Sequence, residues 1–139
     1  MSDSPVIVAV VAGHGRFADG VLSAVDQITG RGGAFVAVSN TGLGPTDLEA
    51  LIVSALDRTG ARVVFTDLPA GSCTMAVRRA QRARSDIVLV TGANVAVLME
   101  FLFSTEGPLG TPVGGLSDVG NLARVAAEKA RGTLAVFGS

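Results

Sequence analysis

Short apolar runs alternate along this chain with longer stretches in which apolar residues recur every three or four positions. Near-continuous apolar runs are typical of strands in a sheet that is covered on both faces, and the longer stretches have the period of amphipathic helices. The expected strands cover residues 6–11, 34–38, 62–66 and 87–91, and the expected helices cover residues 17–29, 46–60, 72–83, 94–103 and 117–131. The alternation predicts an α/β fold, a mainly parallel open sheet of four strands with helices on both faces.

Local signals place the helix starts and the last element. Thr46 with Glu49 three positions later forms a candidate capping box, N-caps are expected at Ser72 and Ser117, and a short apolar helix is expected to begin at Asn94. A loop rich in Pro and Gly covers residues 107–115, and residues 133–137 form a final β-prone segment. Without a repeat or a linker, residues 1–139 are expected to form a single domain.

Composition and charge exclude several classes of protein. A hydrophobic content of 48% supports a large core, and a net charge of -1 gives no electrostatic reason to expect nucleic acid or an anionic membrane as a partner. No apolar run approaches the ~20 residues that span a bilayer, so no direct membrane insertion is expected. Because no leader pattern opens the chain, we expect a cytoplasmic protein.

The chain has one cysteine and one histidine, which limits its metal and redox chemistry. Cys73 cannot form an internal disulfide, and neither residue type is numerous enough for a cysteine or histidine cluster, so no metal and no cofactor are expected. Cys73 lies in the first turn of a predicted helix, where its pKa could be lowered. We favour the interpretation of Cys73 as a passive small residue.

Polar and flexible residues follow the predicted strands. Gly13, His14 and Gly15 follow the first strand, Asp67 follows the third, and Thr91-Gly92-Ala93-Asn94 follows the fourth. Because the carboxyl ends of parallel strands meet at one edge of a sheet, His14 and Asp67 are expected to meet. A carboxylate that accepts a hydrogen bond from one imidazole nitrogen leaves the other nitrogen as a nucleophile.

A helix start next to these two residues suggests a site for an anion. Gly71 allows close approach of a ligand, and Ser72 begins a predicted helix whose free backbone N–H groups suit a phosphate. Two simpler interpretations remain open at this point: Asp67 as a turn former before Pro69, and Ser72 as an N-cap alone.

Two other sequence features have ordinary explanations. Residues 13–18 fit the dinucleotide-binding pattern G-x-G-x-x-G/A, but Ser39-Asn40 stands where that motif requires an acid. Four arginines (Arg78, Arg79, Arg82 and Arg84) lie along one predicted helix. They are expected to form a solvated face, with a docking surface for an acidic partner as the alternative.

Three segments together resemble the mannose-family enzyme IIA domain of the bacterial phosphoenolpyruvate-dependent sugar phosphotransferase system. They are the strand-Gly-His-Gly opening with residues 17–24, the stretch Val63-Val64-Phe65-Thr66-Asp67-Leu68-Pro69-Ala70-Gly71-Ser72, and residues 91–100 with their Gly-x-Asn and apolar helix. The resemblance covers nearly the whole chain. Two positions depart from the family pattern: Ala70 replaces the first glycine of a pair, and Cys73 replaces the proline that commonly follows the serine, a variant similar to the amino-sugar branch.

The resemblance implies roles for individual residues. His14 would accept a phosphoryl group from the phosphocarrier HPr and pass it to a histidine of a IIB partner on a separate chain, which phosphorylates the sugar during uptake. Asp67 would orient His14, and Ser72, with Gly15 and Gly71, would bind the phosphate. The family is typically a homodimer that exchanges its last strand, which gives residues 133–137 a partner.

Other functions remain open on the sequence. One is a regulatory or dihydroxyacetone-kinase-type phosphocarrier, which would use the same histidine. Another is a non-catalytic module that binds an anion at the strand ends. A third is a small-molecule enzyme in which His14 acts as the acid-base catalyst.

Overall fold

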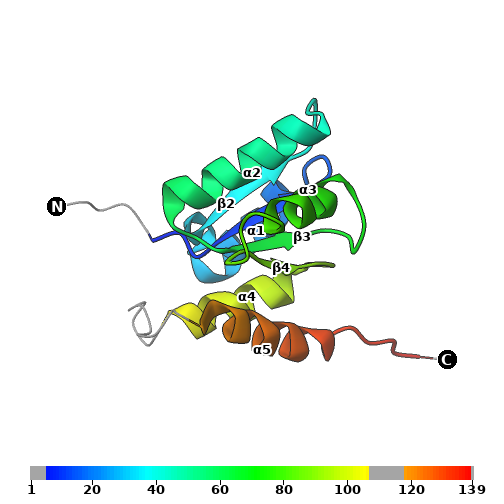
Figure 1. The fold of residues 1–139 in the computed structure, drawn as a ribbon. Helices are drawn as coiled ribbons and strands as arrows, with labels where there is room; N and C mark the ends of the chain where they lie inside the picture. Colours follow the sequence, from blue (N-terminus) through cyan, green and yellow to red (C-terminus); the bar gives the residue numbers. More distant parts are fainter. Residues whose placement is uncertain (1–5, 107–117, 139) are drawn as a thin grey trace.

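The structure, a computed structural model, describes residues 6–106 and 118–138. Four parallel strands form one sheet in the order β2-β1-β3-β4: β1 Ala9–Gly13, β2 Phe35–Ser39, β3 Val63–Thr66 and β4 Val88–Val90 (Figure 1). The helices are α1 Phe17–Thr29, η1 Gly32–Ala34, α2 Pro45–Thr59, α3 Ser72–Gln81, α4 Val95–Thr105 and α5 Val119–Arg131. The predicted α/β class and the four-stranded parallel sheet are confirmed.

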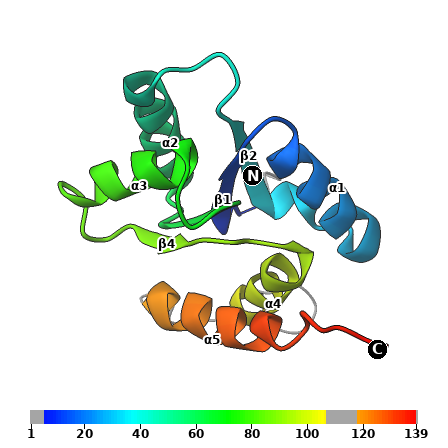
Figure 2. The same ribbon diagram turned by 90° about the vertical axis from the view of Figure 1, so that its right-hand side faces the viewer.

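Side chains alternate between the two faces of the sheet, as the pleat requires. Val11 and Phe65 belong to the core beneath α1, α4 and α5, whereas Val10 and Val64 belong to the core beneath α2 and α3. Figure 2 shows α2 and α3 on one side of the sheet and α4 and α5 on the other. The prediction of helices on both faces is therefore confirmed.

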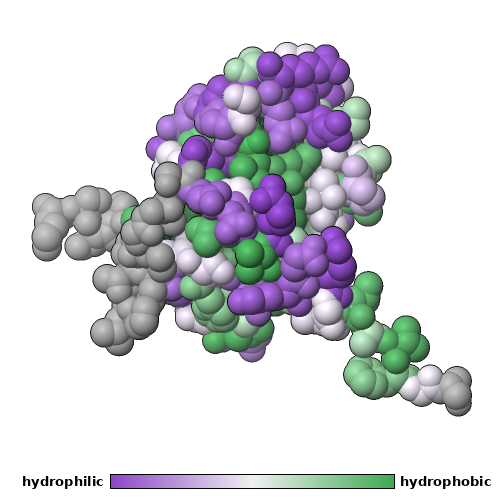
Figure 3. All heavy atoms as spheres, turned by 60° about the horizontal axis from the view of Figure 1, so that its bottom comes forward, coloured by the Kyte–Doolittle hydropathy of each residue, from purple (hydrophilic) through white to green (hydrophobic). Residues whose placement is uncertain are grey.

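The segment after α5, which the sequence predicts to be β-prone and to be exchanged in a dimer, is not a strand within the single chain. Its side chains Leu134, Val136 and Phe137 are 89%, 94% and 93% exposed. Figure 3 shows this apolar arm standing out from the body of the molecule. A β-prone segment becomes a strand only when a sheet edge pairs with it, and within the single chain this segment pairs with neither edge strand, β2 or β4.

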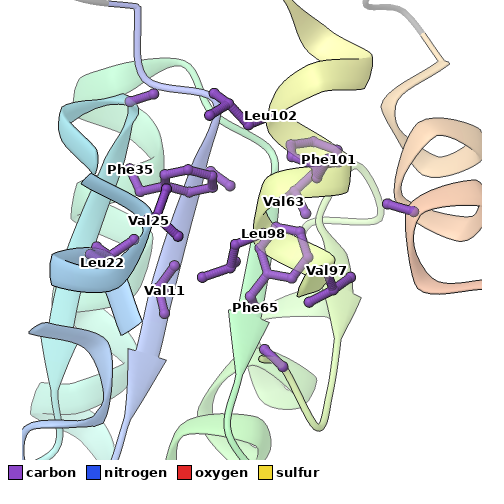
Figure 4. Close-up of a cluster of buried hydrophobic side chains, with 14 of the residues drawn as sticks. Val11, Leu22, Val25, Phe35, Val63, Phe65, Val97, Leu98, Phe101 and Leu102 are labelled. Carbon is purple, nitrogen blue, oxygen red and sulfur yellow. The ribbon is translucent and has the colours of Figure 1, made fainter. Parts of the chain in front are cut away.

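The larger of the two cores packs two phenylalanines between the sheet and α4. The rings of Phe65 and Phe101 meet edge to face, with centroids 5.3 Å apart and planes at 69°. Val11, Val25, Phe35 and other apolar side chains surround them, as Figure 4 shows. Edge-to-face pairs contribute about 0.5–1.5 kcal/mol beyond the burial of their area.

Several helix starts differ from the sequence-based expectations. The capping box at Thr46 is wrong, because α2 begins at Pro45 behind the N-cap Gly44 and the Glu49 carboxylate pairs with Arg79 at 3.0 Å. Pro suits the first helical position since it has no N–H to leave unpaired. The helix expected to begin at Asn94 is confirmed as α4, and Asn94 is its N-cap, whose side chain accepts a 2.8 Å hydrogen bond from the Val97 N–H.

The start of α5 and the preceding loop fall at the edge of the described residues. The expected loop at 107–115 and the expected cap Ser117 lie outside them. Within the described part, the Asp118 side chain caps α5 by accepting a 3.2 Å hydrogen bond from the Asn121 N–H.

The core arrangement predicts unequal effects for two phenylalanines on α4. Phe101 is fully buried and Phe103 is 54% exposed. Phe101→Ala should lower the free energy of unfolding by about 3–5 kcal/mol, because it opens a cavity between Phe65 and the helix. Phe103→Ala, the matched control, should change it by less than about 1 kcal/mol. Urea unfolding followed by circular dichroism measures both, and equal losses would contradict this packing.

Candidate functional site

The site lies where the strand order reverses direction. The chain leaves β1 for β2 on one side of the sheet and later enters β3 on the other side of β1. In open α/β sheets, ligands bind in the crevice outside the carboxyl ends of the two strands that flank such a point. Gly13 is the last residue of β1 and Thr66 the last of β3, so His14 and Asp67 come next at this crevice.

His14 and Asp67 are held together by two hydrogen bonds, as the sequence predicted. The backbone N–H of His14 donates to Asp67 Oδ2 at 2.9 Å, and the ring Nδ1 lies 2.7 Å from the same oxygen. The His14 side chain is 45% exposed, whereas that of Asp67 is 13% exposed. The carboxylate is thus mostly enclosed, while the ring it holds stays open to solvent.

The charge of Asp67 decides which nitrogen of the His14 ring carries the hydrogen that faces it. Burial acts to raise the pKa of the Asp67 carboxyl, but the backbone and side-chain hydrogen bonds from His14, with its charge interaction, outweigh burial and lower the pKa below its ordinary value of 3.8. An ionised carboxylate only accepts hydrogen bonds, so Nδ1 must be the donor. In the neutral ring, Nε2 then carries the lone pair.

Two glycines allow the groups of the site to approach this closely. A Cβ on Gly71 would lie 3.0 Å from His14 Cε1, and a Cβ on Gly13 would lie 2.6 Å from Phe17 Cδ2 and 3.1 Å from Asp67 Oδ2. Gly71 is also the N-cap of α3, whose first helical hydrogen bond runs from the Met75 N–H to the Gly71 carbonyl at 2.9 Å. The N–H groups of the first turn therefore have no partner inside the helix, and they start beside the His14 ring.

A buried pair of hydroxyls holds the connection between β3 and α3. Thr74 Oγ1 donates to the Leu68 carbonyl at 2.6 Å, and Thr66 Oγ1 lies 2.7 Å from Thr74 Oγ1. Because the single hydroxyl hydrogen of Thr74 is used on Leu68, Thr66 must be the donor to Thr74. Both threonines are buried, so this chain fixes the loop that carries Asp67. The sequence analysis missed this pair.

Ser72 lies at the site, but it is not the helix cap that the sequence suggested. It is the first residue of α3 and makes no capping bond; instead, its Oγ accepts a 3.1 Å hydrogen bond from Asn40 Nδ2. Gly15 is also in reach of Asn40, with its N–H 3.4 Å from Asn40 Oδ1, and its carbonyl accepts from Ser39 Oγ at 2.8 Å. Asn40 was missed, although it directly follows β2 and the strand-end argument applies to it as well.

Cys73 is buried beneath the site and does not serve as a nucleophile there. Burial, joined by the negative charge of Asp67, raises the pKa of its thiol to about 11, and a hydrogen bond with Ser72 only partly opposes this. The thiol therefore stays protonated near neutral pH, which agrees with the passive role favoured by the sequence.

The remaining candidates lie apart from the histidine. The Asn94 side chain is used as the cap of α4. Of the four arginines, Arg78 and Arg82 are exposed as predicted, whereas Arg79 pairs with Glu49 and Arg84 pairs with Asp57 and Asp86. These three ion pairs occupy two of the four arginines within the chain itself.

Residues 6–106 and 118–138 contain no group of three or more His, Cys, Asp or Glu side chains placed to hold a metal ion. In the same ranges, no helix has the length and apolar character needed to cross a bilayer.

The pairing with His14 predicts how stability depends on pH. Because the pKa of Asp67 is lower in the folded state, its contribution is complete above its ordinary value of 3.8 and is lost as the pH falls through the folded value. At pH 7, Asp67→Asn should therefore destabilise the protein by about 1.5–3 kcal/mol, the range for hydrogen bonds to charged groups.

Urea unfolding from pH 7 to pH 3 measures this difference. The gap between Asp67→Asn and the unsubstituted protein should shrink as the pH falls below about 4, because the carboxyl of the unfolded chain then binds a proton before the folded carboxylate does. Asp19→Asn removes an exposed carboxylate on α1 and is the matched control, with little change at any pH. A gap that stays constant down to pH 3 would contradict the lowered pKa.

Comparison with known proteins assigns the family. The sequence model of the EIIA-man family, described as the PTS system fructose IIA component, matches residues 8–109. The comparison with curated proteins found no significant match.

Solved structures share the fold at low sequence identity. The phosphotransferase system component EIIA from Streptococcus agalactiae is 21% identical, with a TM-score of 0.69 over 93% of this chain and 96% of that one. The mannose/sorbose specific IIA subunit from Enterococcus faecalis is 19% identical, with a TM-score of 0.72 over 96% of each chain. The PTS IIA protein associated with the fucose utilization operon of Streptococcus pneumoniae is 19% identical, with a TM-score of 0.70 over 97% and 96%. The chain belongs to the mannose-type enzyme IIA family of the phosphotransferase system.

Proposed function

We propose that this protein is a phosphocarrier that accepts a phosphoryl group from HPr on His14 and passes it to a histidine of a IIB partner for sugar uptake. Membership of the enzyme IIA family supports a role in phosphoryl transfer. The observation that carries the proposal is the 2.7 Å contact of Nδ1 with Asp67, which leaves Nε2 of a half-exposed ring beside the start of α3.

In the accepting step, the lone pair of His14 Nε2 attacks the phosphorus of phosphorylated HPr. The N–P bond to the HPr histidine breaks, its electron pair returns to that ring, and a new bond forms between phosphorus and Nε2. The Nδ1 proton stays on the hydrogen bond to Asp67, whose charge balances the positive charge that develops on the ring. Such a step needs alignment and charge stabilisation more than covalent machinery.

The start of α3 stabilises the phosphoryl oxygens on His14. The N–H groups of the first turn carry the positive end of the helix dipole, and Gly71 lets the backbone approach the ring. Ser72 adds a hydroxyl, and Gly15 keeps the loop after His14 short and open on the other side. Together these groups replace the solvent that the phosphoryl group loses when the two proteins meet.

The site is open enough to serve two protein partners in turn. His14 is 45% exposed, and Leu68 and Met75, on the loop before α3 and on α3 itself, are 48% and 50% exposed. A shallow surface of this kind favours small, short-lived complexes over a deep enclosed site. Residues 1–139 would act as one phosphocarrier domain in the cytoplasm, where phosphorylated HPr is available.

Transfer from phosphoenolpyruvate through enzyme I and HPr tests the proposal. The purified protein should acquire an acid-labile phosphoryl group that mass spectrometry places on His14, and His14→Ala should acquire none. Asp67→Ala should slow the transfer roughly 100-fold, because the ring loses its fixed orientation. Asp86→Ala, an exposed carboxylate that precedes β4 at the opposite edge of the sheet, is the control and should transfer normally.

Label that survives the loss of His14 would overturn the proposal. A protein that takes no label but binds inorganic phosphate would be the anion-binding module instead. A phosphorylated protein that does not pass its group to IIB but does pass it to a dihydroxyacetone kinase subunit would be the regulatory or kinase-type carrier.

The protein is also proposed to form a homodimer through its C-terminal arm. The arm exposes Leu134, Val136 and Phe137 almost completely, and β4 is an edge strand of the sheet. The groove beside that edge is lined by Val88, Val90, Ala123 and Ala127 from β4 and α5, among others. The arm of a second copy would pair with the open edge of β4 and cover these apolar side chains. The dimer would then leave neither an unpaired strand edge nor an exposed apolar arm.

Removal of residues 133–139 tests the dimer. Light scattering coupled to size exclusion should give twice the chain mass of 14.0 kDa for the full protein and the chain mass itself for the truncated one. Phe137→Asp should also weaken the dimer, whereas Leu51→Asp, on the half-exposed face of α2, should not. A dimer that survives the truncation would contradict the role of the arm.

A further inference from the structure

Asn40 is placed at the site by its backbone before its side chain is considered. Its N–H donates to the Gly13 carbonyl at 3.2 Å, and its carbonyl accepts from the Leu43 N–H at 3.1 Å. The first of these bonds ties Asn40 to the residue that precedes His14. The β2–α2 loop therefore has a fixed position relative to the end of β1.

The side-chain amide of Asn40 joins the two segments that flank His14. Its Oδ1 accepts from the Gly15 N–H at 3.4 Å, and its Nδ2 donates to Ser72 Oγ at 3.1 Å. The orientation of the amide follows from chemistry, because a backbone N–H only donates and must face the oxygen. The NH₂ group is then directed at Ser72.

This contact decides what the Ser72 hydroxyl can do. A hydroxyl has one hydrogen to donate and two lone pairs to accept with. Asn40 occupies a lone pair of Ser72 Oγ, so the hydroxyl hydrogen is left to be donated to another acceptor, and within the chain its acceptor is the Cys73 sulfur. The neighbouring Cys73 thiol offers only a weakly accepting sulfur, whereas a phosphoryl oxygen on His14 is a strong, charged acceptor.

We propose that Asn40 is a positioning residue for phosphoryl transfer, which holds the Ser72 hydroxyl so that its hydrogen is directed at the phosphoryl group on His14. The inference rests on the proposed function and goes beyond it. It adds the residue that follows β2 to a site otherwise formed by the segments after β1 and β3. Asn40 acts through Ser72 and does not itself bond the phosphoryl group.

The fold does not depend on the Asn40 side chain. The backbone bonds to Gly13 and Leu43 remain when the amide is removed, and Ser39 Oγ still donates to the Gly15 carbonyl at 2.8 Å. Asn40 variants should therefore fold, which makes kinetic measurements on them interpretable.

Single-turnover transfer from phosphorylated HPr tests the inference. Asn40→Ala should lower kcat roughly 5- to 20-fold, the size of one hydrogen bond to a charged group, with the KM for HPr unchanged. Asn40→Asp keeps the shape but removes the donor and adds a negative charge, so it should lose more. Asn121→Ala, an exposed asparagine on α5, is the matched control and should behave like the unsubstituted protein.

A double-mutant cycle with Ser72→Ala separates a positioning role from an independent one. If Asn40 acts through Ser72, the double variant should be no slower than Ser72→Ala alone. Additive losses, an unchanged kcat in Asn40→Ala, or a loss confined to KM would each overturn the inference. Absence of label on the unsubstituted protein would instead overturn the proposed function and this inference with it, so the two failures are distinguishable.

Discussion

The hydrogen bond between His14 Nδ1 and Asp67 joins residues 53 positions apart in the sequence, and the rest of the site is arranged around it. It exists because β1 and β3 are neighbours in a fixed register, with Ala12 paired to Thr66. The two chains leave the sheet side by side immediately after this pair. A slip of one residue would turn every side chain of one strand to the opposite face, so the buried cores on both faces protect the geometry of the site.

The groups around this bond are of two kinds: buried groups that support it and polar groups near the surface. The buried hydroxyls of Thr66 and Thr74 fix the loop that carries Asp67. A side chain at Gly71 would press on the His14 ring, and one at Gly13 would press on Phe17 and Asp67. Ser72 is exposed and Asn40 is half-buried, and the Asn40 amide, from a separate segment, donates a hydrogen bond to the Ser72 hydroxyl beside the ring. The site thus combines a rigid, buried support with a small, open surface.

The sequence predicted those features that depend on periodicity and on parallel strands. Alternating runs gave the α/β class, and the meeting of His14 with Asp67 followed from the shared edge of parallel strands. The helix start at Asn94 was also predicted, because the signal is local: the Asn94 side chain caps α4 through the Val97 N–H three residues later.

The features that were missed depend on contacts between distant segments. Ser72 looked like an N-cap, but its hydroxyl contacts Asn40 from a different strand end. The box at Thr46 failed because Pro45 starts the helix one residue earlier and Arg79 on another helix takes Glu49. Residues 133–137 have strand-forming side chains, yet within the single chain they pair with neither edge of the sheet and form no strand.

The protonation of the His14 ring is the most direct measurement, and the chain simplifies it because His14 is the only histidine. Long-range proton–nitrogen NMR correlation on the uniformly labelled protein above neutral pH reports which ring nitrogen carries hydrogen. The account predicts hydrogen on Nδ1, held by Asp67, and a bare Nε2, with the pattern lost in Asp67→Asn. A ring with hydrogen on Nε2 and a bare Nδ1 would contradict it, because the nitrogen that is meant to attack phosphorus would have no lone pair.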